Sequence, residues 1–293
     1  MIAAVGIVYN SRTASAKNMA EEIAGLLGPG RECWVKSAGD LDEVDGSLKE
    51  TDLIVTVGGD GTILRAAQAA VSHDIPLLGV NMGRLGFMTE LRPADALERI
   101  PGFLEGEGWV EERSMVKAAV LHESASQETG SSEPEWHHAL NDVVVTRGAT
   151  PRLIWVRALV DGAELTSYRS DAVIVSSATG STGYNLSSGG PILDPRAEEM
   201  VLKPVAPHVG LATAVVLPPS VSIELWVESA EGAVLSVDGY MNRPLGQGSG
   251  VRIQKSERKA KFLRGRSSRE FYASLTRRLG FEGGMGAGRA VFY

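Results

Sequence analysis

The segment Asp52-Leu53-Ile54-Val55-Thr56-Val57-Gly58-Gly59-Asp60-Gly61-Thr62 joins an apolar run directly to a glycine-rich turn. The run predicts a buried β-strand, and the turn predicts a backbone that a ligand can approach closely, because glycine permits positive φ angles. A helix pattern follows, with apolar residues on one face: Ile63, Leu64, Ala66, Ala67, Ala70 and Val71. The turn therefore precedes a helix N-terminus, whose N–H groups and partial positive charge suit phosphate.

Asp60 is the unusual member of this turn. A carboxylate beside phosphates is electrostatically unfavourable unless it has a task, and two tasks fit phosphoryl transfer. It could accept a proton from an attacking hydroxyl, or it could hold Mg²⁺. Gly59, Gly61 and Thr62 surround it, and Arg65, one helical turn further on, is placed to contact a second phosphate. The turn matches neither the P-loop nor the dinucleotide-binding fingerprint, and a plain tight turn stays an alternative.

Strand and helix patterns alternate on both sides of this segment. Ala3 to Tyr9 and Pro76 to Val80 predict further buried strands. Apolar residues between Ala16 and Leu27 recur at helical spacing, and Pro93 is expected to open another helix, where its missing N–H costs nothing. Strands that alternate with helices predict a Rossmann-like α/β domain with a parallel sheet, placed at residues 1–113.

Strand signals dominate residues 114–266, which predicts an all-β second domain. Asp161-Gly162 is a two-residue hairpin signal between two such runs. Residues 123–135 carry almost no apolar side chain and are expected to form a loop. The predicted strands are 141–146, 153–160, 163–168, 172–177, 214–217, 221–227, 233–237 and 251–254.

A last helix is predicted within residues 267–293. Phe271, Leu275 and Leu279 recur four apart, Ser267 or Ser268 is expected to cap the helix, and Gly280 is expected to end it.

Composition limits the function classes. The chain has 293 residues and a formal net charge of −7, which disfavours nucleic acid as a partner because an acidic surface repels its phosphates. The single cysteine, Cys33, excludes an internal disulfide and a Cys-cluster metal site, and it is expected to be buried. No apolar run approaches the roughly 20 residues that span a bilayer, so no membrane partner is expected. We expect a cytoplasmic protein.

Several motifs together resemble the NAD kinase family. The Asp60 turn is similar to the hallmark shared by NAD kinases, diacylglycerol and sphingosine kinases and phosphofructokinases. Three further segments are similar to those of NAD kinases: Asn81-Met82-Gly83-Arg84-Leu85-Gly86-Phe87, Asn141-Asp142, and Ser170-Asp171 through Thr179-Gly180-Ser181-Thr182-Gly183-Tyr184-Asn185-Leu186-Ser187-Ser188-Gly189-Gly190-Pro191. The resemblance covers residues 5 to 280, and the stretch from Thr179 to Pro191 is its most specific part.

The resemblance implies a fold and an activity. The fold would be an N-terminal α/β domain, residues 1–113, joined by the helix in 267–293, and a C-terminal β-sandwich that binds NAD, residues 114–266. NAD would lie between the two domains. The activity would be transfer of the γ-phosphoryl group of ATP to the 2′-hydroxyl of the adenosine ribose of NAD, giving NADP and ADP. Mg²⁺, or another divalent ion, would be carried by the ATP phosphates near Asp60, and homodimers or homotetramers are expected.

The resemblance also implies roles for single residues. Asp60 would take the proton of the ribose hydroxyl. Asn141 and Asp142 would hydrogen-bond the ribose and adenine side of NAD, while Arg169 and Asp171 would face its far end. Phe87 would pack near the nucleotide, and Arg152 would supply a polar contact. The adenine pocket would be lined by Thr182, Gly183, Tyr184, Asn185, Leu186 and Ser187, with Tyr184 as a stacking face.

The chain departs from the family pattern at three positions. Asp142 replaces the usual Glu and is shorter by one C–C bond, about 1.5 Å. Ala178 and Gly183 replace the usual Pro and Ala. Two alternatives remain open at this point: a lipid kinase that shares the Asp60 turn, and a non-catalytic dinucleotide-binding module.

Overall fold

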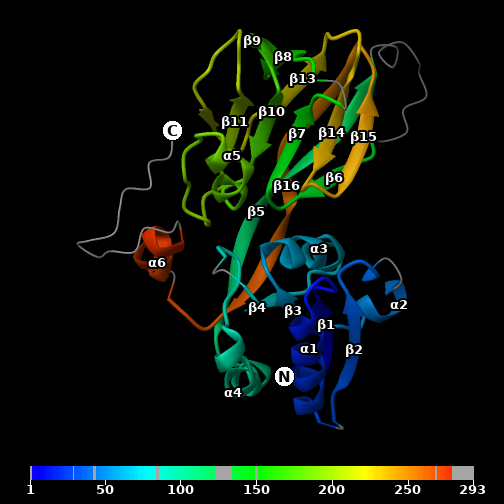
Figure 1. Cartoon of the computed structure of the whole chain (residues 1–293), viewed down its shortest axis with the longest axis vertical. Coiled ribbons are helices and arrows are strands. Elements are labelled where there is room, and N and C mark those ends of the chain that lie inside the picture. The colour runs from blue at the N-terminus through cyan, green and yellow to red at the C-terminus, as the bar shows by residue number, and fades with distance from the viewer. Residues whose placement is uncertain are drawn as a thin grey trace. The chain divides into compact units, whose positions relative to one another are not determined.

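The chain divides into two units in the computed structural model (Figure 1). Unit 1 comprises Met1–Glu112 and Ala260–Tyr293, and unit 2 comprises Arg113–Lys259. The structure describes residues 2–28, 30–41, 44–83, 86–122, 134–148, 151–267 and 269–278. Arg84, Leu85 and Ser268 lie outside the described residues. So do most of the predicted loop (123–133) and the chain from Leu279 onward, which includes Gly280.

Unit 1 is built on a parallel sheet with the strand order β2-β1-β3-β4. Next to β4, Phe262 of β16 pairs in parallel with Leu77. The strands are β1 (Ala4–Tyr9), β2 (Glu32–Ser37), β3 (Leu53–Gly58), β4 (Leu77–Asn81) and the end of β16 (Ser249–Arg264), whose residues 249–259 belong to unit 2. The helices are α1 (Ala14–Leu26), α2 (Asp45–Leu48), α3 (Asp60–Ala70), the 3-10 helix η2 (Val71–His73), α4 (Pro93–Leu104) and α6 (Glu270–Arg278).

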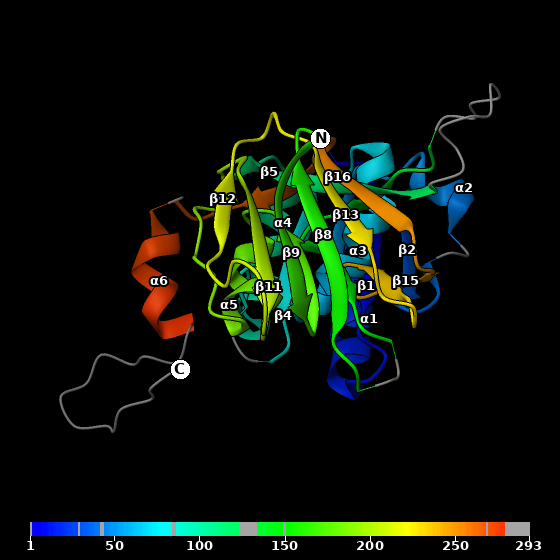
Figure 2. The same ribbon diagram turned by 90° about the horizontal axis from the view of Figure 1, so that it is seen from above.

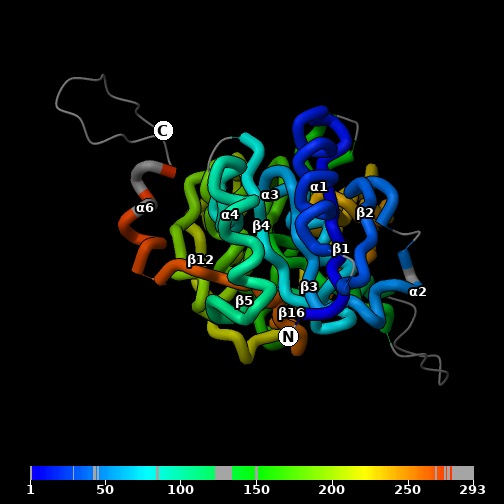
Figure 3. The backbone as a smooth tube through the Cα atoms, turned by 90° about the horizontal axis from the view of Figure 1, so that it is seen from below, coloured from blue at the N-terminus to red at the C-terminus, as the bar shows by residue number. Residues whose placement is uncertain are grey.

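β3 is buried on both faces because helices cover both sides of the sheet. Leu53, Val55 and Val57 point into a core shared with α1 and α4, and Figure 3 shows those two helices running over the strands. On the opposite face, α3 lies so close to β4 that a Cβ on Gly79 would be 2.9 Å from Cδ1 of Ile63. The predicted parallel α/β architecture is confirmed, as is the start of α4 at Pro93.

The sequence patterns do not predict β2, and the expected burial of Cys33 is wrong. β2 pairs only with β1 in the order of the described sheet, so it is an edge strand. Glu32 and Cys33 are exposed there, and only Ser37 is fully buried. An edge strand lacks the continuous apolar run that marks a strand covered on both faces.

Unit 2 is a β-sandwich, as predicted, with its core between two sheets. One sheet has the order β12-β11-β10-β7-β14-β15, and every neighbouring pair in it is antiparallel. In the other, β8 lies between β13 and β9 (Figure 2), and β5 pairs with β6. The strands are β5 (Trp109–His122), β6 (His137–Ala139), β7 (Asp142–Thr146), β8 (Ile154–Val160), β9 (Ala163–Ser170), β10 (Ala172–Ser176), β11 (Met200–Val205), β12 (Val215–Leu217), β13 (Ile223–Val227), β14 (Ala233–Val237) and β15 (Met241–Leu245).

The predicted hairpin at Asp161-Gly162 is confirmed. The two residues join β8 to β9 and have φ angles of 49° and 79°. Positive φ at both central positions is the geometry that matches the twist of the flanking strands. Four strands, β5, β6, β11 and β15, were not predicted. β5 carries charged residues such as Glu111 and Arg113 that are buried in the fold, so its polarity conceals it.

The helix predicted near the C-terminus is present as α6. The Ser267 hydroxyl accepts a hydrogen bond from the Arg269 amide at 3.4 Å, and the Ser267 carbonyl accepts one from the Glu270 amide at 3.0 Å. In the described part of the chain, no helix is long and apolar enough to cross a membrane.

We predict that Gly6→Ala destabilises unit 1. A Cβ at Gly6 would overlap the indole of Trp34, which cannot move freely because its Nε1 donates to Thr51 Oγ1 at 2.9 Å. The expected loss is about 1–3 kcal/mol, measured by thermal or denaturant unfolding. Gly25→Ala in α1 is the matched control, since nothing lies within 4 Å of its Cβ position, and helix propensity there gains up to about 1 kcal/mol. Equal stability of the two variants would contradict the prediction.

Candidate functional site

The Asp60 turn, residues 58–62, lies at the carboxyl end of β3. Gly59 is the N-cap of α3 and Asp60 is its first residue. The loop after β4 is pinned to the turn because the Met82 amide donates to the Gly58 carbonyl at 3.0 Å. Ends of parallel strands beside helix N-termini are where open α/β sheets bind ligands. The local fold thus places a carboxylate where the helix dipole favours negative charge.

The Asp60 carboxylate is held from outside its own helix. Its Oδ2 accepts a hydrogen bond from the Phe87 amide at 2.9 Å, and its Oδ1 accepts one from the Met88 amide at 3.2 Å. The side chain is only half-buried. Both oxygens therefore have a fixed direction, while each retains further acceptor capacity for a hydroxyl or a metal ion.

Two glycines make room for this arrangement. A Cβ on Gly86 would overlap the Asp60 carboxylate, with Oδ2 only 2.6 Å away. A Cβ on Gly58 would overlap the side chain of Thr62, which is buried. These positions require glycine because of close approach, and neither has a positive φ. Glycine at position 86 therefore leaves the space that the Asp60 carboxylate occupies.

The other predicted residues of unit 1 lie around the turn. Gly61 is exposed in the first turn of α3. Arg65 is half-buried and its Nε donates to the Ala38 carbonyl at 3.2 Å. The Phe87 ring is 5.6 Å from the Arg278 guanidinium and 6.4 Å from the Phe271 ring, so Phe87 joins the Asp60 turn to α6.

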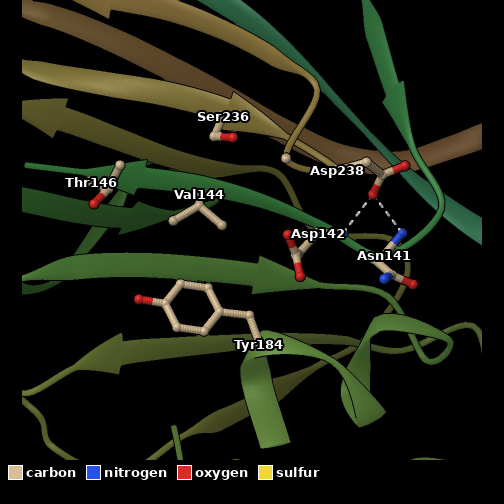
Figure 4. Close-up of a pocket in the computed structure, with 8 residues that line it drawn as sticks. Asn141, Asp142, Val144, Thr146, Tyr184, Ser236 and Asp238 are labelled. Carbon is tan, nitrogen blue, oxygen red and sulfur yellow. Dashed lines mark hydrogen bonds between the residues drawn. The ribbon is translucent and has the colours of Figure 1, made fainter. Parts of the chain in front are cut away.

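A second candidate site, the sheet pocket, lies in unit 2 and has a volume of about 330 Å³. β7 and β14 supply its floor, and α5 (Tyr184–Ser187) supplies Tyr184 at its side (Figure 4). Side chains alternate along β7, so one set faces this pocket while Val143 and Val145 point into the sandwich core. The lining residues are Asn141, Asp142, Val144, Thr146, Tyr184, Ser236, Asp238 and Gly239.

The Asp238 carboxylate organises the pocket by accepting hydrogen bonds from three backbone amides. Its Oδ2 accepts from Leu140 at 2.8 Å, and its Oδ1 accepts from Asn141 at 2.7 Å and from Asp142 at 3.1 Å. Asp238 itself has a left-handed backbone with φ of 50°, which Asp tolerates better than most residues. Asn141 Oδ1 is buried and has no hydrogen-bond partner among the described residues. This orphaned acceptor is what a ligand N–H or O–H would satisfy.

Hydrogen bonds within the loop between β10 and β11 hold it in a conformation in which Tyr184 reaches the pocket. Asn185 is fully buried, and its Nδ2 donates to the carbonyls of Ser181 and Pro191, both at 2.9 Å. A Cβ on Gly180 would overlap the Asn141 carbonyl, so this loop packs directly on the start of β7. Asn185 thus braces the loop from inside, and Tyr184, 43% exposed, presents its ring.

Of the residues from Thr182 to Ser187 that were predicted to line the pocket, only Tyr184 does so. Thr182 donates through its hydroxyl to the Thr179 carbonyl at 3.1 Å, and Ser187 donates to the Tyr184 carbonyl at 3.0 Å. Leu186 is half-buried. A Cβ on Gly183, where the resemblance leads one to expect alanine, would lie 3.6 Å from Asn141 Nδ2. Glycine therefore leaves space beside Asn141.

Three further predicted residues, which lie outside this loop, do not line the pocket either. Asp171 pairs with Arg147 at 2.8 Å, but its charge still acts on Tyr184. The pKa of Tyr184 is raised by burial and then by Asp171 and Asp142, although Arg147 opposes this. Arg169 is exposed and its amide donates to the Val209 carbonyl.

Arg152 is directed toward solvent and is also absent from the pocket lining. Its side chain is 74% exposed and pairs with Glu231 at 2.6 Å. Sequence reasoning gave no site role to five lining residues: Val144, Thr146, Ser236, Asp238 and Gly239. The signal for Asp238 and Gly239 was the segment Val237-Asp238-Gly239, which is similar to one of the family, whereas the three strand residues could be found only from strand register.

Asp142 carries the strongest electrostatic perturbation at the pocket. It is 8% exposed, and burial together with the nearby Asp238 raises its pKa from 3.8 to about 7. A buried carboxylate without a cation prefers its neutral form. Near neutral pH Asp142 can therefore donate a hydrogen bond as well as accept one, which suits a ligand hydroxyl.

Family models match both parts of the chain. The ATP-NAD kinase N-terminal domain matches residues 47–108, and the ATP-NAD kinase C-terminal domain matches residues 140–265. A protein of Dehalococcoides mccartyi named NAD kinase is 39% identical over 277 residues, which cover 94% of this chain and 95% of the relative.

Solved structures of similar fold include two kinases. An NAD kinase from Archaeoglobus fulgidus in complex with ATP is 27% identical with a TM-score of 0.73, covering 96% of this chain and 100% of that one. The yeast NADH kinase complexed with NADH has a TM-score of 0.82 and 23% identity, covering 99% of this chain and 90% of that one, a likeness that shows the fold alone.

We predict that Asp142→Asn stabilises the protein in a pH-dependent way. The folded-state pKa of Asp142 lies above its unfolded value, so its contribution to stability is complete below about pH 4 and is lost as pH rises to about 7. Asparagine carries no charge, so the variant should gain on the order of 2 kcal/mol at pH 8 and much less at pH 4. Urea unfolding across this range measures the difference. Ser236→Ala, a non-titrating change in the same pocket, is the control, and a pH-independent effect of Asp142→Asn would disprove the assignment.

Proposed function

The chain belongs to the ATP-NAD kinase family, and on this premise we propose that Asp60 accepts the proton of the NAD hydroxyl that is phosphorylated. The activity itself follows from the family: the protein is a kinase that transfers a phosphoryl group to NAD. The alternative of a lipid kinase is set aside, because both matching family models are those of ATP-NAD kinases and the relative from Dehalococcoides mccartyi is named NAD kinase.

The single observation that carries the proposal is the clamped carboxylate of Asp60. Amides of Phe87 and Met88 fix its two oxygens at the N-terminus of α3. In the proposed step the 2′-oxygen of the adenosine ribose forms a bond to the γ-phosphorus of ATP. The bond from that phosphorus to the oxygen bridging to the β-phosphorus breaks, ADP leaves with the electron pair, and the hydroxyl proton passes to Asp60.

Asp60 need not be a strong base for this role. The ribose hydroxyl is a weak acid, so its proton is transferred late, after the bond to phosphorus has largely formed. Most of the acceleration then comes from placing the hydroxyl and from stabilising charge on the phosphoryl group. The fixed orientation of the Asp60 carboxylate therefore matters more for placing the hydroxyl than its basicity does.

We propose that the sheet pocket binds the adenosine part of NAD. Asn141 Oδ1, which has no hydrogen-bond partner within the described part of the chain, offers an acceptor to a ribose hydroxyl or to the adenine amino group. Asp142, whose pKa of about 7 leaves part of it protonated at neutral pH, offers a donor to a ribose hydroxyl. Tyr184 offers a flat face at the pocket side (Figure 4). Although Asp142 is shorter than the usual Glu, the hydrogen bond from its backbone amide to the Asp238 carboxylate holds it at the pocket floor.

A divalent cation, Mg²⁺ in the first instance, is proposed to enter with ATP. No group of three or more His, Cys, Asp or Glu side chains that could hold a metal occurs in the described parts of the chain. Mg²⁺ commonly binds through one or two carboxylates plus substrate phosphates, and Asp60 is the carboxylate at the turn. When bound, the ion would neutralise phosphate charge. A cytoplasmic location and a homodimer or homotetramer stay predictions from the sequence.

We predict that Asp60→Asn lowers the rate of NADP formation by a factor of about 100 or more. The affinity for NAD should stay within a few-fold, since the proposed adenosine contacts come from unit 2. Coupled NADP assays give the rate and calorimetry gives the affinity. Asp95→Asn, which alters an exposed pair with Arg92 on α4, should keep the normal rate. A non-catalytic dinucleotide-binding module would bind NAD and form no NADP in either protein.

We predict that Gly86→Ala also lowers turnover, by about tenfold or more, because its Cβ overlaps the Asp60 carboxylate and must displace it. Gly83→Ala in the same loop is the matched control, since nothing lies within 4 Å of its Cβ position. Both are assayed with saturating NAD and ATP. Similar rates in the two variants would show that the orientation of Asp60 does not limit catalysis.

A further inference from the structure

The two residues whose amides clamp Asp60 also have carbonyls that are hydrogen-bonded. The Phe87 and Met88 amides point to the Asp60 carboxylate, and their carbonyls point to two arginines. Arg278 Nη1 donates to the Phe87 carbonyl at 3.1 Å, and Arg264 Nη1 donates to the Met88 carbonyl at 2.8 Å. Both arginines come from the last described part of unit 1, about two hundred residues from Asp60 along the chain. Each clamping residue therefore links Asp60 on one side to a guanidinium on the other.

Arg264 is a fully compensated structural charge. It is 7% exposed, its Nε donates to Glu111 at 2.8 Å, and Glu90 lies 3.5 Å from its Nη1. Removing one member of such a buried cluster would leave uncompensated charge and cost several kcal/mol. Arg264 thus belongs to the framework of unit 1, and its replacement would not report on catalysis.

Arg278 has a different environment. No carboxylate lies within ion-pair distance of it among the described residues, and its buried Nε has no hydrogen-bond partner there. The guanidinium stacks on the Phe87 ring at 5.6 Å, and the Phe271 ring on the same helix packs on Phe87 at 6.4 Å. Residues of α6 therefore contact Phe87 at two places: they pack on its ring and donate a hydrogen bond to its carbonyl.

The charged groups around Arg278 include Asp60 itself. Burial lowers the pKa of Arg278, Arg264 and Arg266 lower it further, and Asp60 and Glu90 raise it. Asp60 is thus one of two carboxylates among the described residues that favour the charged form of this guanidinium. A positive charge close to Asp60 that makes no direct ion pair with it leaves the carboxylate oxygens available to the amides and to substrate.

We infer that Arg278 is a positioning residue for Asp60, acting through the peptide that joins Phe87 to Met88. Its hydrogen bond to the Phe87 carbonyl fixes the plane of that peptide and so the direction of the Met88 amide, which donates to Asp60 Oδ1. Hydrogen bonds in a chain also polarise one another, which strengthens the hold on Asp60. The inference rests on the proposed role of Asp60, and it assigns α6 a part in catalysis without contact to substrate.

The test compares Arg278→Met with Arg269→Met in the full-length chain. Arg269 is exposed just before α6, so its loss should leave kinetics unchanged. For Arg278→Met we expect kcat to fall by about tenfold to a hundredfold, with the KM for NAD within about twofold, the effect typical of a lost supporting contact. An unchanged kcat in a folded Arg278→Met protein would overturn the inference.

A double-mutant cycle separates positioning from general destabilisation. In the Asp60→Asn background, Arg278→Met should change the residual rate by less than about twofold, because the group it positions is already gone. A loss of the same factor in both backgrounds would overturn the inference. High activity in Asp60→Asn alone would instead refute the proposed role of Asp60, so the two failures are distinguishable.

Arg278→Lys keeps the inference testable if the methionine variant does not fold. Lysine retains the charge and a donor for the Phe87 carbonyl, so we expect kcat between those of the wild type and Arg278→Met. Without the methionine variant, a wild-type kcat in Arg278→Lys together with a wild-type kcat in Arg278→Gln would overturn the inference. Thermal unfolding of each variant establishes that the compared proteins are folded.

Discussion

Two hydrogen bonds from the Phe87 and Met88 amides to the Asp60 carboxylate are the constraint that fixes the direction of the proposed proton acceptor. They join the helix after β3 to the loop after β4, so the turn and the loop cannot move independently. Charge-assisted hydrogen bonds of this kind are stronger than neutral ones. The glycine at position 86 follows from the same constraint, since any side chain there would occupy the place of the carboxylate.

Unit 2 uses a carboxylate in the same way but for a different purpose. Asp238 accepts hydrogen bonds from the backbone amides of Leu140, Asn141 and Asp142. These bonds fix the start of β7, which presents Asn141 and Asp142 to the pocket. This arrangement is energetically unfavourable in one respect, because it buries a second carboxylate, that of Asp142, near the first. The raised pKa of Asp142 expresses that cost. An energetically unfavourable group that persists at a pocket is typical of a binding site.

The structure bears out the strongest local patterns of the sequence and shows why weaker ones failed. β3 and the helix after it were predictable because both faces of the strand are covered and its residues form an unbroken apolar run. The hairpin at Asp161-Gly162 was predictable because only a few residue pairs accept two positive φ angles. β2 was not predicted because an edge strand has exposed positions that interrupt the apolar pattern. β5 was not predicted because its buried charged residues cannot be distinguished from surface residues in the sequence.

The Asp60 turn, the likeness to NAD kinases and the candidate residues Asn141, Asp142 and Tyr184 were readable from the chain, because each depends on residues close together in sequence. The partners that hold them were not. Arg278 and Arg264 lie about two hundred residues from Asp60, and Asp238 lies about one hundred from Asn141. No local pattern encodes such pairs, because backbone amides and carbonyls are the same at every residue. Their hydrogen-bond partners are chosen by strand order and by helix packing, which exist only once the chain has folded.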